Sequence, residues 1–234
     1  MKKPIVFDTG PIISLTLNNV LWLIEPLHEK FDGEFYITPG VYDELINRPL
    51  NTKKYKFEAL QILPLITKNI LNNYNSDDMQ NKANELLQVA NHTFKARNNW
   101  IKIVHRGEME AIACALVTDS ETLVIDERTT RVLIESPDLL KRQLERKLHT
   151  GIEVKEDNLN QLKEELKNLN VIRSFELVTI AFELGLLNMF TLKEQEKVVP
   201  NIRSAVLEGV LWGVKLNGCS VKREEIYEVI DLEK

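Results

Sequence analysis

Two aspartates each end a short apolar run of the kind that forms a buried strand. Asp8 follows the run 5–7, and the turn residues at 10–11 end that strand through their backbone preferences. Asp126 follows the apolar run 122–125 in the same way. Open α/β sheets bind ligands at the carboxyl ends of their parallel strands. Capping of the next helix is an alternative role for Asp8, but capping alone hardly explains two strands that both end in aspartate.

A third carboxylate lies on a predicted helix that starts at residues 38–39, where a threonine and a proline favour a helix N-terminus. Val41, Glu44 and Leu45 share one face of this helix because they are three or four positions apart. Asp43 points away from that face. A carboxylate on an apolar face is costly unless it is paired or coordinated. Glu44 is therefore a candidate site residue, and a surface position at the margin of the apolar stripe is its alternative.

Two further acids, Glu108 and Glu110, open the helix predicted from the segment "RGEMEAIACALV". The helix is apolar and small-sided almost all round, so we expect it to be buried. The helix dipole also favours negative charge in a first turn, which is the alternative explanation for both residues. They are two positions apart and face different directions, so at most one of them is central to a site.

Four carboxylates at one edge of a sheet would repel one another and raise one another's pKa unless cations lay among them. Hard oxygen ligands of this kind suit Mg²⁺ or Mn²⁺. Such cations support hydrolysis of phosphodiesters. The chain has no glycine-rich phosphate loop, and its four histidines lack the spacing of a zinc site.

The elements that position these acids alternate between strands and helices, which predicts an α/β fold with a parallel central sheet. The expected strands are 5–7, 35–37, 100–104 and 122–125, with a further core strand and helix in 171–187. Residues 11–31 are expected to form one helix, and residues 52–99 two helices with a break at 71–78. A capping box at Thr191 and Glu194 predicts a tail helix from about 192, and another helix follows from about 221.

Length and composition describe an ordinary globular protein of 234 residues with 44% apolar and 28% charged residues. We expect a domain over 1–190 with a helical insertion at about 136–169. Residues 191–234 form a helical extension that packs on the domain or at a dimer interface. The absence of a long apolar run and the two isolated cysteines predict a cytoplasmic protein without membrane contact.

The formal net charge of −5, from 30 basic and 35 acidic residues, argues against nonspecific coating of duplex nucleic acid. Local basic patches remain. Lys53 and Lys54 lie near the start of a predicted helix and either contact phosphate or form an ordinary solvated face. The densest basic stretch is 141–149.

Taken together, the acidic segments resemble the motifs of the PIN domain family of nucleases. "VFDTGPIISL" is similar to the first motif of that family, "ITPGVYDEL" to the second, "GEMEAIACAL" to the third and "LVIDERTTR" to the fourth. The resemblance implies a three-layer α/β/α fold, here with extra C-terminal helices. It also implies cleavage of single-stranded or structured RNA with Mg²⁺ or Mn²⁺, leaving a 3′-hydroxyl and a 5′-phosphate. Asp8, Glu44, Glu108 and Asp126 would hold metal and orient water.

The same resemblance implies supporting roles for other residues. Glu108 is preferred over Glu110 because its eighteen-residue step to Asp126 fits the family's spacing. Thr9 would support Asp8, and Ser174 stands where the family often keeps a small hydroxyl. Arg128 and Arg131 would meet phosphates or pair with surface acids.

Family members often form homodimers, and the VapC-type toxins among them pair with antitoxins. This chain is longer than many such toxins, which favours a less specialised nuclease. Two other functions compete. A PIN-like scaffold could bind RNA or protein without cutting, although such a scaffold has no need to keep four mutually repelling acids. The letters "FDTG" also resemble the signature of aspartic proteases, but those are all-β and would need a second copy.

Overall fold

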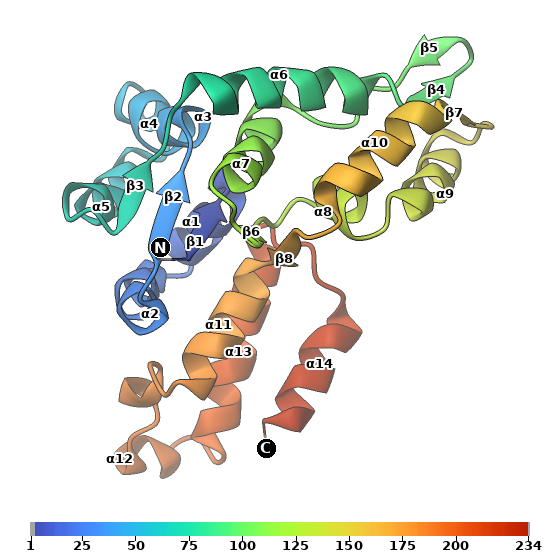
Figure 1. Cartoon of the computed structure of the whole chain (residues 1–234). Helices are drawn as coiled ribbons and strands as arrows, with labels where there is room; N and C mark the ends of the chain where they lie inside the picture. Colours follow the sequence, from blue (N-terminus) through green and yellow to red (C-terminus); the bar gives the residue numbers. More distant parts are fainter. Residues whose placement is uncertain (1–2, 234) are drawn as a thin grey trace.

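A sheet of five parallel strands forms the centre of the molecule (Figure 1). The computed structural model describes residues 3–233. The strands, in their order across the sheet, are β3 (Leu71–Asn73), β2 (Glu34–Ile37), β1 (Pro4–Phe7), β6 (Thr122–Val124) and β8 (Asn170–Ile172). The predicted α/β fold with a parallel central sheet is confirmed.

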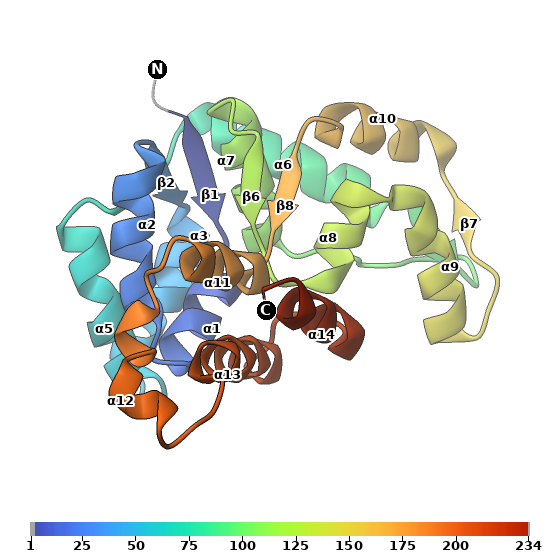
Figure 2. The same ribbon diagram turned by 90° about the horizontal axis from the view of Figure 1, so that it is seen from below.

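Alternation of side chains along the strands divides the core into two clusters, one on each face of the sheet. In β1, Ile5 and Phe7 join one cluster and Val6 joins the other. The first face is covered by α1 (Thr9–Leu17), α2 (Ile24–Phe31), α5 (Lys56–Thr67), α11 (Ser174–Glu183), α13 (Ile202–Leu216) and α14 (Arg223–Leu232). The second face is covered by α6 (Asp77–Asn91), α7 (Arg106–Val117), α8 (Arg128–Glu135), α9 (Pro137–Leu148) and α10 (Glu156–Leu166). Figure 2 shows the resulting three layers from below.

Two local breaks differ from the expected helices. The helix predicted over 11–31 is divided, because Asn19 adopts a left-handed backbone conformation with φ of 57° after α1 ends. A short 3₁₀ turn, Leu21–Leu23, then leads into α2. The helix after β2 begins as α3 (Pro39–Tyr42), continues through a π-helical turn, Asp43–Asn47, and ends as α4 (Arg48–Leu50).

The third strand of the parallel sheet is not the segment that the sequence predicted. The prediction of a core strand over 100–104 was wrong, and β3 takes that place beside β2. Of residues 100–104, only Trp100 belongs to a strand, β5 (Asn99–Trp100). This strand pairs antiparallel with β4 (Phe94–Ala96), which also pairs with β7 (Glu153–Val154). The small second sheet lies beyond the ends of α6 and α10 (Figure 1).

The C-terminal helices are part of the main core rather than an appendage on its surface. Leu207, Leu211 and Val214 of α13 are fully buried, in the same cluster as Phe7 and Ile12. Before α13, the chain forms the short elements Asn188–Phe190 and α12 (Lys193–Glu196), so the expected helix from 192 is interrupted. No helix among residues 3–233 has the length and apolar character needed to cross a bilayer.

Candidate metal centre at the carboxyl edge of the sheet

Pairing of β1 with β6 brings the two aspartates to neighbouring positions at the carboxyl edge of the sheet. Phe7 is in register with Val124, and the N–H of Asp8 donates to the carbonyl of Val124 at 2.9 Å. Gly10 packs between the two carboxylates: a Cβ atom there would lie 3.4 Å from Cβ of Asp126 and 3.8 Å from Oδ2 of Asp8. Gly10 therefore lies in ordinary contact distance of both acids, which places Asp8 and Asp126 on either side of the same backbone segment.

Asp126 is held in one orientation by three hydrogen bonds. The hydroxyls of Ser14 and Ser174 donate to its Oδ2 at 2.9 and 2.7 Å, and the backbone N–H of Ser174 donates to its Oδ1 at 2.8 Å. The carboxylate is 3% exposed. Ser174 stands where the resemblance placed a supporting hydroxyl. Ser14 was not predicted, because its contact with Asp126 spans 112 residues and leaves no local pattern.

Asp8 is buried and lacks a cationic partner within the part of the chain that the structure describes. Burial is the largest influence on its carboxyl group and raises its pKa to about 7. The backbone N–H groups of Thr9 and Gly10 oppose this rise, whereas the negative charges of Glu108 and Glu44 increase it. Both glutamates therefore lie close enough to Asp8 for their charges to be felt.

Glu108 occupies the first turn of α7, where its carboxylate accepts from the N–H of His105. Burial raises its pKa above the ordinary value, against the lowering effect of that hydrogen bond. The charges of Glu127 and Glu44 raise the pKa further, and that of Lys102 lowers it. Glu127 is an acid that the sequence did not single out as a site residue, although it directly follows Asp126.

Glu44 reaches the cluster from the π-helical turn. Its Oε2 accepts a hydrogen bond of 2.9 Å from the hydroxyl of Thr9, and its Oε1 lies near Gly107. The expectation that Glu44 points inward needs correction, because 43% of its side chain is exposed. The extra residue in the π-helical turn moves the carboxylate to the rim. Thr9 thus contacts Glu44 through its hydroxyl, in addition to the hydrogen bond that its backbone N–H gives to Asp8.

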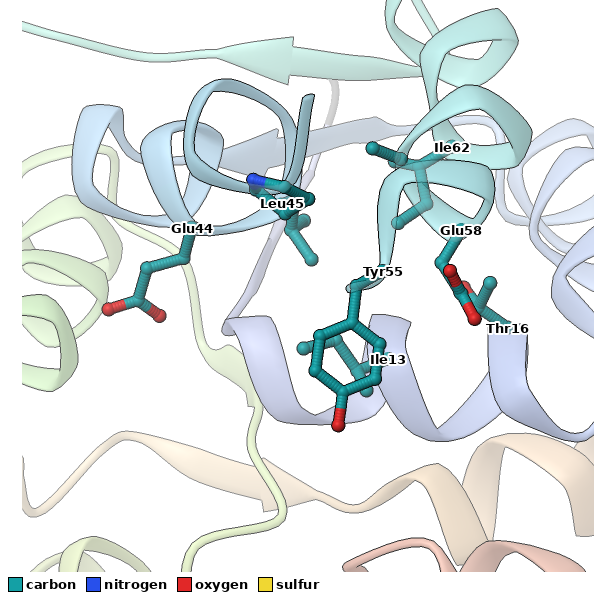
Figure 3. Close-up of a pocket in the computed structure, with 9 residues that line it drawn as sticks. Ile13, Thr16, Glu44, Leu45, Tyr55, Glu58 and Ile62 are labelled. Carbon is teal, nitrogen blue, oxygen red and sulfur yellow. The ribbon is translucent and has the colours of Figure 1, made fainter. Parts of the chain in front are cut away.

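A small apolar pocket lies beside Glu44, between α1 and α5 (Figure 3). Figure 3 shows the Glu44 carboxylate directed away from the Tyr55 ring, which lies on the other side of the pocket. The volume is about 40 Å³. Ligand pockets usually enclose roughly 300 Å³ or more, so this space is too small for a nucleobase.

Glu110 lies on a different side of α7 and belongs to the structural framework. Its Oε2 accepts from the N–H of Gly40 at 3.0 Å, and its Oε1 accepts from Nε of Arg106 at 2.8 Å. Arg106 also donates to Gln80. Glu110 therefore ties α7 to α3 and is not free to bind a metal, consistent with the preference for Glu108.

The four cations expected to meet phosphate lie in different surroundings. Arg128 is exposed at the start of α8. Arg131 is largely covered, with 17% of its side chain exposed and its Nε 3.9 Å from Glu135. Lys53 and Lys54 lie in the exposed turn before α5, and Nζ of Lys54 is 4.5 Å from the centre of the Tyr55 ring. Arg128 is thus better placed for an RNA contact than Arg131.

The C-terminal extension forms hydrogen bonds with Asp126 and with Ser14, which binds Asp126. The N–H of Ser220 donates to the carbonyl of Asp126 at 3.4 Å, and the Ser14 hydroxyl also reaches the carbonyl of Asn217 at 3.5 Å. Burial raises the pKa of the Cys219 thiol to about 12, so it is a neutral packing group near Asp126. The connection between α13 and α14 therefore fixes the backbone around this aspartate.

The donor set fits a hard divalent cation by its chemistry. Asp8, Glu44, Glu108 and Asp126 offer carboxylate oxygens only, and burial is the main cause of the raised pKa of Asp8 and Glu108, with a further rise from the neighbouring acids. In residues 3–233, no three acidic, histidine or cysteine side chains already stand in the positions of metal ligands. Glu44 lies at the rim, where its carboxylate contacts the Thr9 hydroxyl and is 3.9 Å from Nη1 of Arg48.

A parallel sheet between helical layers, with acids at its carboxyl edge, defines the PIN-like class of α/β folds. A family model described as a PIN domain matches residues 4–140. The chain therefore belongs to the PIN domain family, whose members are generally nucleases. No curated protein and no protein of solved structure is significantly similar to it.

Proposed function

We propose that this protein is a divalent-metal-dependent endoribonuclease that hydrolyses phosphodiester bonds in single-stranded RNA. The convergence of Asp8, Glu44, Glu108 and Asp126 from four motifs at one edge of the sheet carries this proposal. A PIN domain over residues 4–140 supports the reaction class. The products would be a 3′-hydroxyl and a 5′-phosphate.

The four acids would hold Mg²⁺ or Mn²⁺. Such a cation, when bound, polarises a phosphoryl oxygen and lowers the pKa of a water molecule. The hydroxyls of Ser14 and Ser174 keep Asp126 aimed at the site, which limits the reorganisation needed when a ligand arrives. Asp8, whose pKa of about 7 leaves it partly protonated at neutral pH, would hold the cation as a carboxylate, so metal binding would be favoured by higher pH.

The test is cleavage of a labelled single-stranded RNA with Mn²⁺, with EDTA, and by the Asp8→Asn and Asp126→Asn variants. We expect activity that requires the metal and falls at least about 100-fold in each variant. Asp43→Asn is the matched control, because this neighbour of Glu44 is exposed and pairs with Arg48 at 2.6 Å. Equal activity with EDTA, or in Asp8→Asn, would contradict the proposal.

Mn²⁺ binding separates the nuclease from a catalytically silent scaffold. Wild-type protein should gain thermal stability on addition of Mn²⁺, and Asp8→Asn should lose most of that gain. Metal binding without cleavage of varied RNAs would indicate a restricted substrate. If Mn²⁺ stabilised wild type and Asp8→Asn equally, the assignment of the four acids would be wrong.

We also propose a homodimer in the cytoplasm, where the two unpaired, buried cysteines stay reduced. Exposed apolar side chains at Leu192 and Val198 of the extension 191–234, together with Met189 just before it, offer a contact surface. An antitoxin is a second candidate for that surface. Light scattering of the purified protein gives the molar mass that distinguishes a monomer from a dimer.

A further inference from the structure

A basic hollow of about 570 Å³ lies between residues 101–103 and the helices α8 and α9. Four cationic side chains line it, namely Lys102, Arg128, Arg146 and Lys147. No acidic residue is among its lining residues. In a chain with a formal net charge of −5, this is a strong local concentration of positive charge. We call it the basic groove.

The cations of the basic groove are available to a ligand. Within residues 3–233, none of the four forms an ion pair with an acid, and all four are exposed. The nearest acid along α9, Glu145, accepts instead from the N–H of Ile152. Four unpaired cations facing one hollow repel one another, and a polyanion removes that repulsion.

The basic groove adjoins the carboxylate cluster. Lys102 lies in the short link between β5 and α7, and Glu108 stands in the first turn of α7. Arg128 is the first residue of α8, two residues after Asp126. Helix α8 therefore begins at the site and carries its first residue into the groove. An extended polyanion bound along the groove therefore reaches toward the four acids.

Part of the lining of the basic groove is apolar. Leu140 and Leu144 of α9 are buried, and Ile101 and Ile103 are half-buried. A chain with anionic groups on one side and flat apolar groups on the other fits these surroundings. Single-stranded RNA has this character, because its bases are unpaired and its phosphates are spaced along the backbone.

We propose that the basic groove binds the phosphodiester backbone of single-stranded RNA next to the bond that is cut. This inference rests on the proposed nuclease function and adds the path of the substrate to it. It also gives the segment 136–169 a role: α9 supplies one wall of the groove through Arg146 and Lys147. The segment thus acts in substrate binding.

The test compares two double variants on the same helix. Arg146→Gln with Lys147→Gln removes two cations from the groove, and Lys141→Gln with Arg142→Gln removes one lysine and one arginine from exposed positions of α9 outside it. Binding of a short, unstructured, fluorescein-labelled RNA is followed by anisotropy in EDTA, so that no cleavage occurs. We expect the groove variant to bind at least about 10-fold more weakly at low salt than the control.

The salt dependence gives a second readout. Each phosphate contact in single-stranded binding contributes roughly −0.7 to the slope of log K against log[salt], so the groove variant should lose about 1.4 from that slope. Equal losses in both variants, or no RNA binding by any of the proteins, would overturn the proposal. So would polyglutamate that displaces RNA as well as unlabelled RNA does, since the groove would then suit an acidic protein segment. The proposed function is judged separately, by the Mn²⁺ dependence of wild type and Asp8→Asn.

Discussion

At the scale of single residues, Asp8 links the candidate site to the stability of the fold. Burial raises its pKa from the ordinary 3.8 to about 7, so the folded protein binds this proton more tightly than the unfolded chain. The resulting contribution to stability is fully present below about pH 4 and is lost as the pH rises toward and through about 7. In the metal-free protein at neutral pH, ionisation of the buried Asp8 therefore lowers the free energy of unfolding.

We predict that Asp8→Asn stabilises the metal-free protein at neutral and mildly alkaline pH. One pKa unit corresponds to about 1.4 kcal/mol, so the gain should reach a few kcal/mol near pH 8 and shrink as the pH falls toward about 4. Urea unfolding in EDTA across this pH range measures it. Asp43→Asn serves as the control, and a constant difference between wild type and Asp8→Asn at all pH values would disprove the pKa assignment.

The proximity of the acids could be predicted from the sequence more readily than the groups that form hydrogen bonds with them. Asp8 and Asp126 end strands, and strands in one parallel sheet bring such ends together, so their proximity follows from a local pattern. The contact of Ser14 with Asp126 depends on the packing of α1 against the sheet, which no local pattern encodes. Glu127 was missed because an acid after Asp126 resembles an ordinary N-cap, a role it also fills for Thr130.

At the scale of elements, α7 places two acids in opposite roles within its first turns. Glu110 satisfies the N–H of Gly40 and pairs with Arg106, whereas Glu108 faces the negative charges of Glu44 and Glu127. Removal of Glu110 leaves the partly buried N–H of Gly40 without its partner, at a cost of about 1 to 3 kcal/mol. Removal of the charge of Glu108 relieves repulsion.

We predict that substitutions of these two residues have opposite effects on stability and on the thermal gain from Mn²⁺. Glu110→Ala should lower the stability by about 1 to 3 kcal/mol and keep most of the thermal gain from Mn²⁺. Glu108→Gln should keep or raise the stability of the metal-free protein and lose most of that gain. Melting curves with EDTA and with Mn²⁺ measure both effects. The reverse pattern would make Glu110 the metal ligand.

The wrong prediction of a core strand over 100–104 also has a physical cause at the scale of elements. Residues 100–104 form an apolar run with one lysine and two isoleucines, as strands often do, yet Ile101 and Ile103 line the basic groove instead of joining the sheet. The actual strand β3 reads Leu71, Asn72 and Asn73, and asparagine is poor in strands. Its backbone is ordered by parallel pairing with β2, a tertiary contact that outweighs local preference.

At the scale of the whole molecule, the helices of the extension 191–234 complete the core on one face of the sheet. Leu211 is fully buried in the cluster that contains Phe7 of the central strand, and Leu216 on the same helix is 78% exposed. The link from α13 to α14 contacts the backbone of Asp126. We therefore propose that the extension folds together with the domain as one cooperative unit.

We predict that Leu211→Ala lowers the stability of the entire protein by about 2 to 5 kcal/mol, because it leaves a cavity in the shared core. For a chain of this size, each kcal/mol lowers the melting temperature by roughly 2 to 4 °C. Leu216→Ala removes the same atoms from the surface of α13 and should change the stability by less than about 0.5 kcal/mol.

Calorimetry distinguishes an extension that folds as one unit with the domain from an extension that only rests on it. One transition that moves as a whole in Leu211→Ala is expected of a single unit, since loss of α13 would expose the face of the sheet that carries Phe7. A second, separate transition, with the main one unmoved, would mean that the extension only rests on a domain that folds without it.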